Sequence, residues 1–308
     1  MSKLAFVFPG QGSQSVGMLA DLAVSHPVIK ATFDEASAAL GLDLWALSQN
    51  GPVEDLNQTE NTQPALLTAG VAVFRAWQAA GGRTPDYLVG HSLGEYTALV
   101  AAGAISLADG VRLVAERGRL MQSAVPAGEG AMAAILGLDD DMVRQCCAEA
   151  AAVGVVEAVN FNAPGQVVIA GSTAAVNAAI EKLKAAGAKR ALPLPVSVPS
   201  HCALMKPAAE KLWPVLESIV FSAPTIPVVQ NVARIEADAF AIREALVQQL
   251  YCPVLWVQCM ETLAGLGVSR ALECGPGKVL CGLNKRIVKE MDCSALESVD
   301  GFAAALTV

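Results

Sequence analysis

Charged side chains are scarce in this sequence. They make up 16% of its 308 residues, against about 25% in ordinary soluble domains, whereas apolar residues make up 54%. The apolar residues are spread along the whole chain, which excludes an intrinsically disordered protein. Long apolar runs are missing as well, since the longest weakly polar stretch, residues 97–108, is too short to span a bilayer. We therefore expect a soluble protein with no membrane partner, despite a mean hydropathy of +0.46.

An excess of basic residues is also absent. The 21 lysines and arginines are outnumbered by 29 aspartates and glutamates, which gives a formal net charge of −8. Nucleic-acid binders usually carry clustered positive charge, so we expect no nucleic-acid partner. The amino terminus runs directly into an apolar segment with no signal or transit pattern, and we therefore expect a cytoplasmic location.

Metal-binding patterns are missing too. The chain has three histidines, and its eight cysteines include no Cys-x-x-Cys pair. A chain of this length buries roughly three quarters of its surface without a metal or a disulfide to hold it. We expect no metal site, and free thiols scattered through the interior.

Short apolar segments followed by helical patterns occupy both ends of the chain. Residues 4–8 and 86–90 are typical of strands buried on both faces of a parallel sheet. Helices are expected over residues 68–80 and 95–102, and a capping box at Ser106 predicts another to residue 124. Helices are expected again at 203–219 and 239–250, with strands at 226–232 and 269–274. Alternating strands and helices indicate the α/β class.

The middle of the chain has a different rhythm. Strands are expected at residues 131–138, 155–161, 167–170 and 190–194, with helices at 139–152 and 172–186, the second capped by Ser172. The order βαββαβ is the ferredoxin-like arrangement. We therefore expect a small ferredoxin-like domain over residues 128–197, inserted into a large α/β domain made of residues 1–127 and 198–308.

The segment Gly90-His-Ser-Leu-Gly94 matches Gly-x-Ser-x-Gly, the nucleophile elbow. A serine on a sharp strand-to-helix turn adopts strained dihedral angles, so its neighbours must be small, and the helix N-terminus favours developing negative charge. The same pattern also occurs in ordinary turns with an exposed serine. Here a predicted strand precedes it and a predicted helix follows, which favours Ser92 as a nucleophile.

A serine nucleophile needs a base, and three histidines are available. His26 lies at a surface helix junction, and His91 is expected to pack beside the elbow with its side chain pointing away from Ser92. His201 follows Val-Pro-Ser at the expected return to the large domain, and loop position and elimination favour it as the base. No aspartate between residues 92 and 201 sits convincingly at a strand end, so the sequence does not supply a third, acidic member.

Two further segments could contribute to chemistry. The loop Gly10-Gln-Gly-Ser-Gln14 follows the first strand and could cradle phosphate, but it lacks the spacing of a dinucleotide fingerprint or a P-loop. Its better use is to present a backbone amide that completes an oxyanion hole with the amide of Leu93. The turn at residues 275–277 is interpreted as loop geometry, and Arg119 as part of a solvated helix face.

Several long motifs in one order resemble a known family. They are residues 8–14 (FPGQGSQ), 62–66, 90–96 (GHSLGEY), 117–118, 160–162, 199–201, 249–251 and 273–277. Together they make the whole chain similar to the malonyl-CoA:acyl carrier protein transacylases of bacterial type II fatty acid synthesis. Cys252 departs from the family, where a polar residue is usual, so the local loop there is in doubt.

The resemblance implies an α/β-hydrolase-like large domain and a seryl-ester, ping-pong transfer of malonyl from malonyl-CoA to the phosphopantetheine thiol of acyl carrier protein. It implies a site made of the nucleophile Ser92, the base His201 held by the main-chain carbonyl of Gln249, the carboxylate partner Arg117, and the oxyanion-hole amides of Gln11 and Leu93. No cofactor is implied beyond the substrate, and we expect a monomer that binds coenzyme A and, transiently, the carrier protein.

Other functions remain open at this point. A serine thioesterase or esterase would share the elbow and the base, but it would have no use for Arg117 as a carboxylate clamp. An acyltransferase of a polyketide pathway would share the whole site, and a non-catalytic nucleotide- or acyl-CoA-binding module would use only the loop at residues 10–12. For docking of an acidic carrier protein we expect two basic clusters: Lys182, Lys184, Lys189 and Arg190, and Lys285, Arg286 and Lys289.

Overall fold

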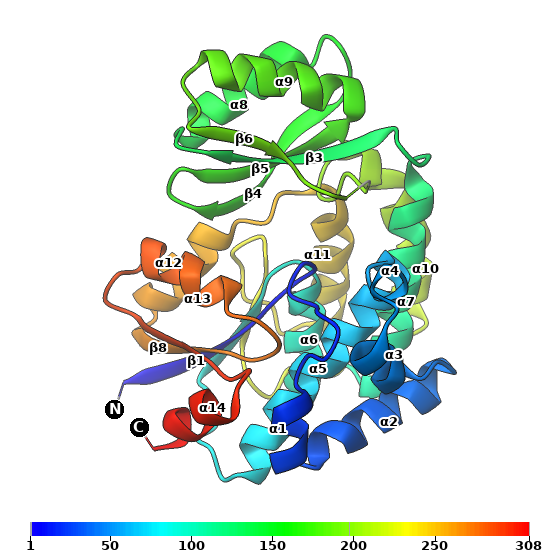
Figure 1. Ribbon diagram of the computed structural model, residues 1–308, viewed down its shortest axis with the longest axis vertical. Coiled ribbons are helices and arrows are strands. Elements are labelled where there is room, and N and C mark those ends of the chain that lie inside the picture. Colours follow the sequence, from blue (N-terminus) through cyan, green and yellow to red (C-terminus); the bar gives the residue numbers. More distant parts are fainter. Residues whose placement is uncertain (1, 197, 308) are drawn as a thin grey trace.

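The computed structural model describes residues 2–196 and 198–307 and contains two sheets (Figure 1). The larger sheet is parallel and has the strand order β7-β2-β1-β8-β9. Its strands are β1 (Lys3–Phe8), β2 (Tyr87–Gly90), β7 (Val228–Val229), β8 (Val268–Glu273) and β9 (Asp292–Ala295). A mixed α/β protein with a parallel sheet is what the alternating pattern predicts.

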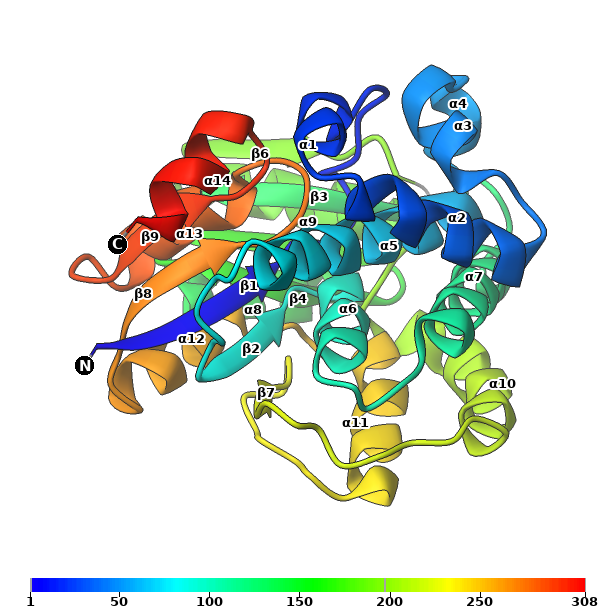
Figure 2. The same ribbon diagram turned by 90° about the horizontal axis from the view of Figure 1, so that it is seen from below.

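Helices cover both faces of the parallel sheet (Figure 2). Phe6 and Phe8 of β1 pack edge-on against Phe74 of α5, whereas Val7 belongs to a second core with Trp256 of α12. Burial on both faces explains why these strands are continuous apolar runs. The helices are α1 (Ala20–Ser25), α2 (Val28–Leu40), α3 (Leu44–Asn50), α4 (Val53–Leu56), α5 (Thr59–Ala79), α6 (Leu93–Ala101), α7 (Leu107–Ala124), the 3-10 helix η1 (Ala203–Met205), α10 (Lys206–Glu217), α11 (Ala239–Tyr251), α12 (Trp256–Gly265), α13 (Val279–Ile287) and α14 (Val299–Leu306).

The second sheet is antiparallel and forms a separate layer at the top of Figure 1. Its strand order is β4-β5-β3-β6, and two helices pack on one of its faces. The elements are β3 (Gly130–Leu136), α8 (Asp140–Ala150), β4 (Val156–Ala163), β5 (Gln166–Ser172), α9 (Thr173–Ala185) and β6 (Arg190–Pro193). We call residues 130–193 the small unit and the other described residues the large unit. The element order of the small unit is the predicted βαββαβ.

The free face of the small unit's sheet lies toward the large unit. Met132 and Val168 on this face form a cluster with Cys202, which belongs to the large unit. The edge strand β4 is also tied by backbone: the Phe161 amide donates to Val254 O at 3.0 Å, and the Val254 amide donates to Val159 O at 2.8 Å. The contacts hold the small unit over one end of the parallel sheet.

Several predicted elements need correction. Helix α5 begins at Thr59 rather than residue 68, because its polar first turns and Pro64 conceal a helix that is buried on all sides. Strand β7 has two residues instead of seven, since the Gln230 amide turns back to Arg234 O. Ser172 precedes α9, but its side chain accepts no hydrogen bond from the helix. The expected helix at 203–219 is a 3-10 turn followed by α10. Helical patterns were expected between the first two strands, but without bounds for α1–α4, and α12, α14 and β9 were not predicted.

The cysteines are distributed as the sequence predicts. All eight cysteines are free thiols, and seven of them are buried, with Cys252 partly exposed. Among the residues that the structure describes, none of the helices is both long and apolar enough to cross a bilayer.

Candidate active site

The elbow, residues 90–94, joins the end of β2 directly to α6. Ser92 has φ 51° and ψ −109°, a conformation that L residues rarely adopt. A Cβ on Gly90 would lie 1.8 Å from the Gly94 carbonyl carbon, and one on Gly94 would lie 2.1 Å from Phe8 O. The two glycines are therefore required sterically, and the turn raises the Ser92 side chain above the end of the sheet.

The glycine-rich loop after β1 lies against the elbow. A Cβ on Gly10 would come within 2.5 Å of His91 O, so only glycine allows this close approach. Gln11 consequently lines the same cavity as Ser92 and Leu93. Leu93 is the first residue of α6, and the amide of a first helical residue has no acceptor within its own helix. Gln11 and Leu93 thus border the same cavity as the Ser92 hydroxyl.

His201 is the histidine that contacts Ser92. Its Nε2 lies 2.8 Å from Ser92 Oγ, and its Nδ1 lies 2.7 Å from the main-chain oxygen of Gln249. A carbonyl can only accept, so Nδ1 carries the proton and Nε2 accepts from the serine hydroxyl. Burial lowers the pKa of His201 to about 3, and the positive charge of Arg117 adds to this effect. The imidazole is therefore neutral at physiological pH, as a base must be.

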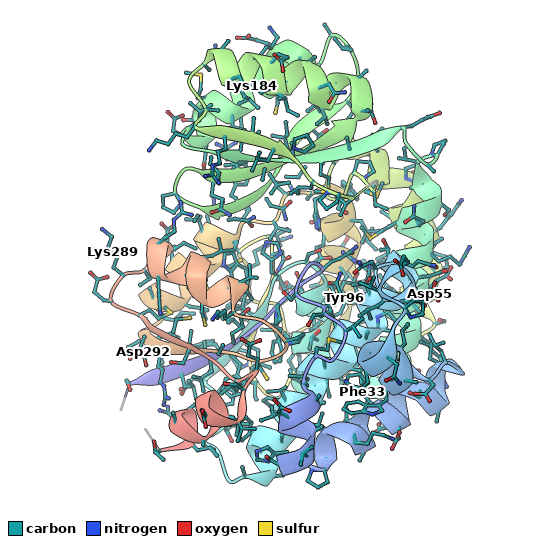
Figure 3. The ribbon with its side chains drawn as sticks, viewed as in Figure 1. Phe33, Asp55, Tyr96, Lys184, Lys289 and Asp292 are labelled. Carbon is teal, nitrogen blue, oxygen red and sulfur yellow. The ribbon has the colours of Figure 1, made fainter. Side chains whose placement is uncertain are left out.

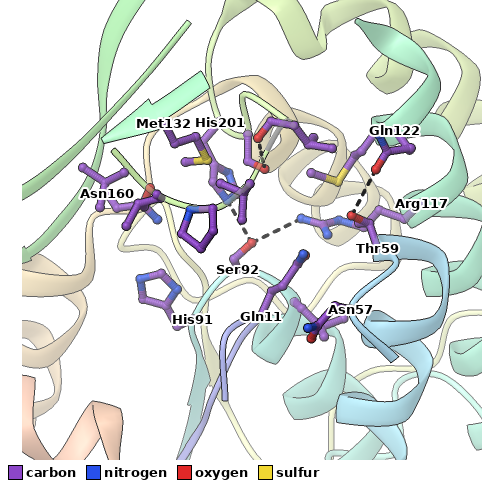
Figure 4. A pocket seen from close by; sticks show the side chains of 18 of the residues that line it. Gln11, Asn57, Thr59, His91, Ser92, Arg117, Gln122, Met132, Asn160 and His201 are labelled. Atoms are coloured by element: carbon purple, nitrogen blue, oxygen red, sulfur yellow. Dashed lines mark hydrogen bonds between the residues drawn. The ribbon is translucent and has the colours of Figure 1, made fainter. Parts of the chain in front are cut away.

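Arg117 of α7 brings a buried positive charge to the serine (Figure 4). Its side chain is 1% exposed, and Nη2 lies 3.4 Å from Ser92 Oγ. Nη1 donates to Gln63 Oε1 at 2.8 Å and Nη2 to Gln249 Oε1 at 2.9 Å, while the guanidinium stacks over the ring of Tyr96. Nε has no hydrogen-bond partner among the described residues. The acceptors that hold Arg117 are neutral oxygens, so the charge is available to an anionic ligand.

Two amide side chains hold the strained backbone of Ser92 in place. Asn231 Oδ1 accepts from the Ser92 amide at 2.7 Å, and its Nδ2 donates to Gly90 O at 2.6 Å. From the other side, Gln249 Nε2 donates to Ser92 O at 2.9 Å. The surrounding structure therefore compensates the unfavourable φ of Ser92.

These groups open into a cavity of about 340 Å³ between the two units. In Figure 4, Ser92 lies near the centre, with Arg117 to one side and with His201, Met132 and Asn160 above it. The lining also includes polar and apolar side chains from both units: Asn57, Thr59, Gln122, Asn162, Val168, Leu194, Val196 and Val198. A serine hydrogen-bonded to a neutral imidazole, with amides and a cation beside it, can attack an acyl carbonyl and stabilise the charge that results.

The remaining predicted residues, all within the described part of the chain, form no hydrogen bond with Ser92 or His201, although His91 lines the cavity. His91 points away from the dyad: its Nε2 lies 2.8 Å from Asn162 Oδ1, and burial lowers its pKa. His26 packs against Phe302, 4.5 Å between ring centroids. Arg119 forms an exposed pair with Glu116, as expected for a solvated face. Residues 275–277 form a turn after β8 that does not line the cavity.

The basic clusters are on the surface (Figure 3), but some members already have partners. Lys182 pairs with Glu149 at 3.3 Å and Lys184 with Glu181 at 2.9 Å. Arg286 of α13 donates to Pro164 O at 2.9 Å and so contacts the turn between β4 and β5. Arg286 therefore also links the two units.

Several residues that build the site have no predicted role in the sequence. Gln63, Glu95 and Asn231 are at most 1% exposed and hydrogen-bond to Arg117, Gln249 or Ser92. Buried polar residues on otherwise apolar helix faces were the available signal for Gln63 and Glu95. Asn231 follows a strand of two residues, and nothing in its local pattern indicates a contact 139 positions away.

Comparison with known proteins agrees with this geometry. A family model described as an acyl transferase domain matches residues 5–262. The chain is 62% identical over 307 residues to the malonyl CoA-acyl carrier protein transacylase of Escherichia coli (strain K12), covering 99% of each. It is 46% identical to the protein of that name from Bacillus subtilis (strain 168), covering 99% of this chain and 97% of the other.

Solved structures give the same result. An acyl carrier protein S-malonyltransferase from Vibrio cholerae matches with a TM-score of 0.96 at 58% identity, covering 98% of this chain and 99% of that one. A malonyl-transacylase in complex with its holo type II PKS acyl-carrier protein matches with a TM-score of 0.98 at 57% identity, covering 99% of each. The resemblance carried by the motifs is thereby confirmed, and the chain belongs to the malonyl CoA-acyl carrier protein transacylases, a family of acyltransferases.

Proposed function

We propose that this protein transfers a malonyl group from malonyl-CoA to the phosphopantetheine thiol of acyl carrier protein, through an ester on Ser92. The observation that carries the proposal is the buried guanidinium of Arg117, 3.4 Å from Ser92 Oγ and held by the neutral oxygens of two glutamine side chains. A carboxylate at the far end of the acyl group would pair with it through two hydrogen bonds. The names of its relatives support the same pair of substrates.

In the first half-reaction, Ser92 Oγ attacks the thioester carbon while His201 Nε2 accepts the hydroxyl proton. The amides of Gln11 and Leu93 would stabilise the oxyanion of the tetrahedral intermediate. The intermediate collapses by breaking the carbon–sulfur bond, and the coenzyme A sulfur leaves with the proton from His201. The main-chain carbonyl of Gln249 keeps Nδ1 protonated throughout, in the place where many triads have an acid.

The second half-reaction reverses these steps. The phosphopantetheine thiol gives its proton to His201 Nε2 and attacks the seryl ester, and Ser92 Oγ leaves with that proton. Each residue serves in both halves, as expected for ping-pong chemistry. The chemistry needs only the two substrates, and we propose that no metal or tightly bound cofactor takes part.

We also propose a finer description of the architecture. Residues 1–127 and 198–308 would form one α/β-hydrolase-like domain, and residues 128–197 an inserted ferredoxin-like domain. The strand order β4-β5-β3-β6 and the elbow at the end of β2 support it. Residues 1, 197 and 308 lie outside the described part of the chain. A cytoplasmic location and a monomeric state complete the proposal.

The test is intact mass spectrometry after brief exposure to malonyl-CoA, with and without holo acyl carrier protein. We expect a malonyl adduct that maps to Ser92 and disappears when carrier protein is added, which becomes malonylated. Loss of the adduct to water at the same rate with and without carrier protein would instead indicate a thioesterase. No adduct at all would indicate a binding module.

The carrier protein could belong to fatty acid or to polyketide synthesis. One structural neighbour was solved with the carrier protein of a type II PKS. Carrier proteins from both pathways should therefore be compared as acceptors, and the ratio of their kcat/KM values gives the preference.

A further inference from the structure

Glu95 is a buried acid that takes no part in the proposed mechanism. Glu95 lies on α6, three residues after Ser92, and is 1% exposed. Its Oε2 accepts two hydrogen bonds, from the Asn231 amide and from Gln249 Nε2, both at 2.9 Å. Its Oε1 has no hydrogen-bond partner among the described residues. Burying a carboxyl group away from water costs folding free energy, so we asked what its contacts contribute to function.

Both hydrogen-bond donors to Glu95 lead to the site. Asn231, held by its backbone amide, binds the Ser92 amide and Gly90 O through its side chain. Gln249 has a side-chain amide whose two ends differ: Nε2 donates to Glu95 and Ser92 O, while Oε1 accepts from Arg117 Nη2 at 2.9 Å. Glu95 is thus connected to Ser92 through Asn231 and to Arg117 through Gln249, and these are the two groups whose relative position matters.

The orientation of the Gln249 amide depends on Glu95. A flipped amide would point its Nε2 at the Arg117 guanidinium, donor against donor, and its Oε1 at the Glu95 oxygen, acceptor against acceptor. With Glu95 absent, only the contact to Ser92 O opposes rotation on that side. The Arg117 fork would then lose a fixed acceptor, and its position relative to Ser92 Oγ would be less defined.

Glu95 also lies where it does not occupy the guanidinium of Arg117. Among the described residues no carboxylate hydrogen-bonds to Arg117, and Glu95 is separated from it by a single amide group. A carboxylate bound directly to Arg117 would compete with an anionic substrate. An acid one amide away leaves Arg117 without a direct carboxylate partner in the described part of the chain, so a substrate carboxylate meets no competitor there.

We propose that Glu95 is a positioning residue that fixes Arg117 through the Gln249 amide and thereby contributes to the preference for acyl groups that end in a carboxylate. This role rests on the proposed function. Glu95 touches no reacting atom in this scheme. Substituting Glu95 should therefore change the ratio of malonyl to acetyl transfer more than it changes either rate.

The experiment measures kcat/KM for malonyl-CoA and acetyl-CoA in wild type, Glu95→Ala and Glu95→Gln. Glutamine can present an oxygen to both donors, so it should keep the wild-type ratio within about threefold. Alanine should lower the malonyl-to-acetyl ratio by about tenfold or more, since misplacement of a positioning group by an ångström costs up to about two powers of ten. If alanine lowers both rates equally, Glu95 is structural and the proposal fails.

A double-mutant cycle tests the route. Gln249→Leu removes the amide and keeps the main-chain carbonyl on His201, and it should lower the ratio as Glu95→Ala does. Combining the two should lower the ratio no further, and an additive loss would overturn the proposed route. If the alanine variant does not fold, Glu95→Asp, which retracts the carboxylate from Gln249, takes its place in the cycle with the same expectation.

A second buried acid provides the matched control. Glu273 is fully buried and accepts from the amides of Leu280 and Cys281, away from the cavity. Glu273→Ala should reduce stability and leave the malonyl-to-acetyl ratio unchanged. Malonyl ester formation on wild-type Ser92 is measured first: its absence refutes the proposed function, whereas normal loading with an unchanged ratio in Glu95→Ala refutes only the role of Glu95.

Discussion

The two units of the molecule use their buried surface differently. In the large unit, β1 is buried at every position after Lys3, and Glu95 and Arg117 are buried charged groups, of which Arg117 lines the cavity. In the small unit, β3 mixes buried and partly exposed residues, and the ion pairs that involve α8 and α9 are on the surface. Among the described residues, the non-glycine positions with positive φ all fall in the large unit: Leu19, Ser92, His201 and Ala233.

The difference separates two kinds of contribution to one cavity. The large unit holds strained backbone and desolvated charge, which are unfavourable for stability and useful for reactivity. The small unit follows ordinary rules of sheet and helix packing and supplies side chains that line one side of the cavity. Mutations in the large unit should therefore change chemistry and stability in opposite directions more often than mutations in the small unit.

The largest effect should come from Ser92→Ala. Without Oγ no seryl ester can form, and kcat/KM for malonyl transfer should fall by about three powers of ten or more. The free energy of unfolding should stay within about 1 kcal/mol of wild type or rise slightly, because alanine adds no atoms to the strained turn. Adduct mass and chemical denaturation measure the two quantities, and substantial malonylation of the variant would exclude Ser92 as the nucleophile.

Arg117→Ala should separate substrates. Malonyl transfer should fall by roughly two to three powers of ten, corresponding to the ~3–5 kcal/mol lost when one partner of a buried pair is removed. Acetyl transfer should hold or rise, since acetyl gives the guanidinium no anionic partner in wild type. Arg117→Lys should rescue in part, because an ammonium lacks the planar fork. Parallel losses of malonyl and acetyl transfer would make Arg117 structural.

Gly90→Ala tests the steric demand of the elbow. The new Cβ would lie 1.8 Å from Gly94, so the unfolding free energy should drop by at least about 3 kcal/mol, with activity lost. A Cβ added to Gly282, on α13, would meet no described atom within 4 Å beyond its chain neighbours and its own helix backbone, and Gly282→Ala should instead stabilise by up to about 1 kcal/mol. Thermal unfolding of both variants measures the contrast, and equal effects would contradict it.

Acid stability should reveal two opposing titrations. The unfolded chain protonates His201 near pH 6.5 but the folded one only near pH 3, so acid destabilises the fold across that window. Burial raises the pKa of Glu95 to about 7 from 4.5, so acid stabilises the fold between those values. In Glu95→Gln only the first effect remains, and stability should fall more steeply from pH 6.5 to 4.5, by roughly 1 kcal/mol per pH unit. Identical slopes for the two proteins would contradict these assignments.

The smallest effect is expected on the surface. Charge reversal at Lys189 or Arg286 should raise KM for carrier protein about fivefold and leave malonyl loading unchanged. Arg286→Glu should also destabilise, because its contact with Pro164 O is lost. Lys30→Glu, on α2 at the opposite end of the molecule from the small unit (Figure 1), is the matched control. An unchanged KM in both test variants would reject docking at these clusters.

The parts of the site that could be predicted from the sequence are those determined by residues close together in the chain. The elbow follows from five consecutive residues, and the βαββαβ order of the small unit from simple periodicity. Contacts between distant segments were not predictable from pattern: Asn231 on the Ser92 amide, Gln63 on Arg117, and Glu95 on Gln249 depend on how helices pack. The polar beginning of α5 was missed for the same reason, since tertiary burial rather than propensity makes residues 59–67 helical.

The bond that orients His201 comes from a main-chain oxygen, and this has a genetic consequence. An acidic triad member can be lost through one nucleotide change, but every amino acid carries the same carbonyl. Substitutions at position 249 can therefore remove the amide that holds Arg117 and Ser92 while the imidazole keeps its tautomer. In a saturation library, many side chains at position 249 should still allow the seryl ester to form, but most of them should lose the discrimination between malonyl and acetyl. At positions 92 and 201, almost no substitution should allow the ester to form.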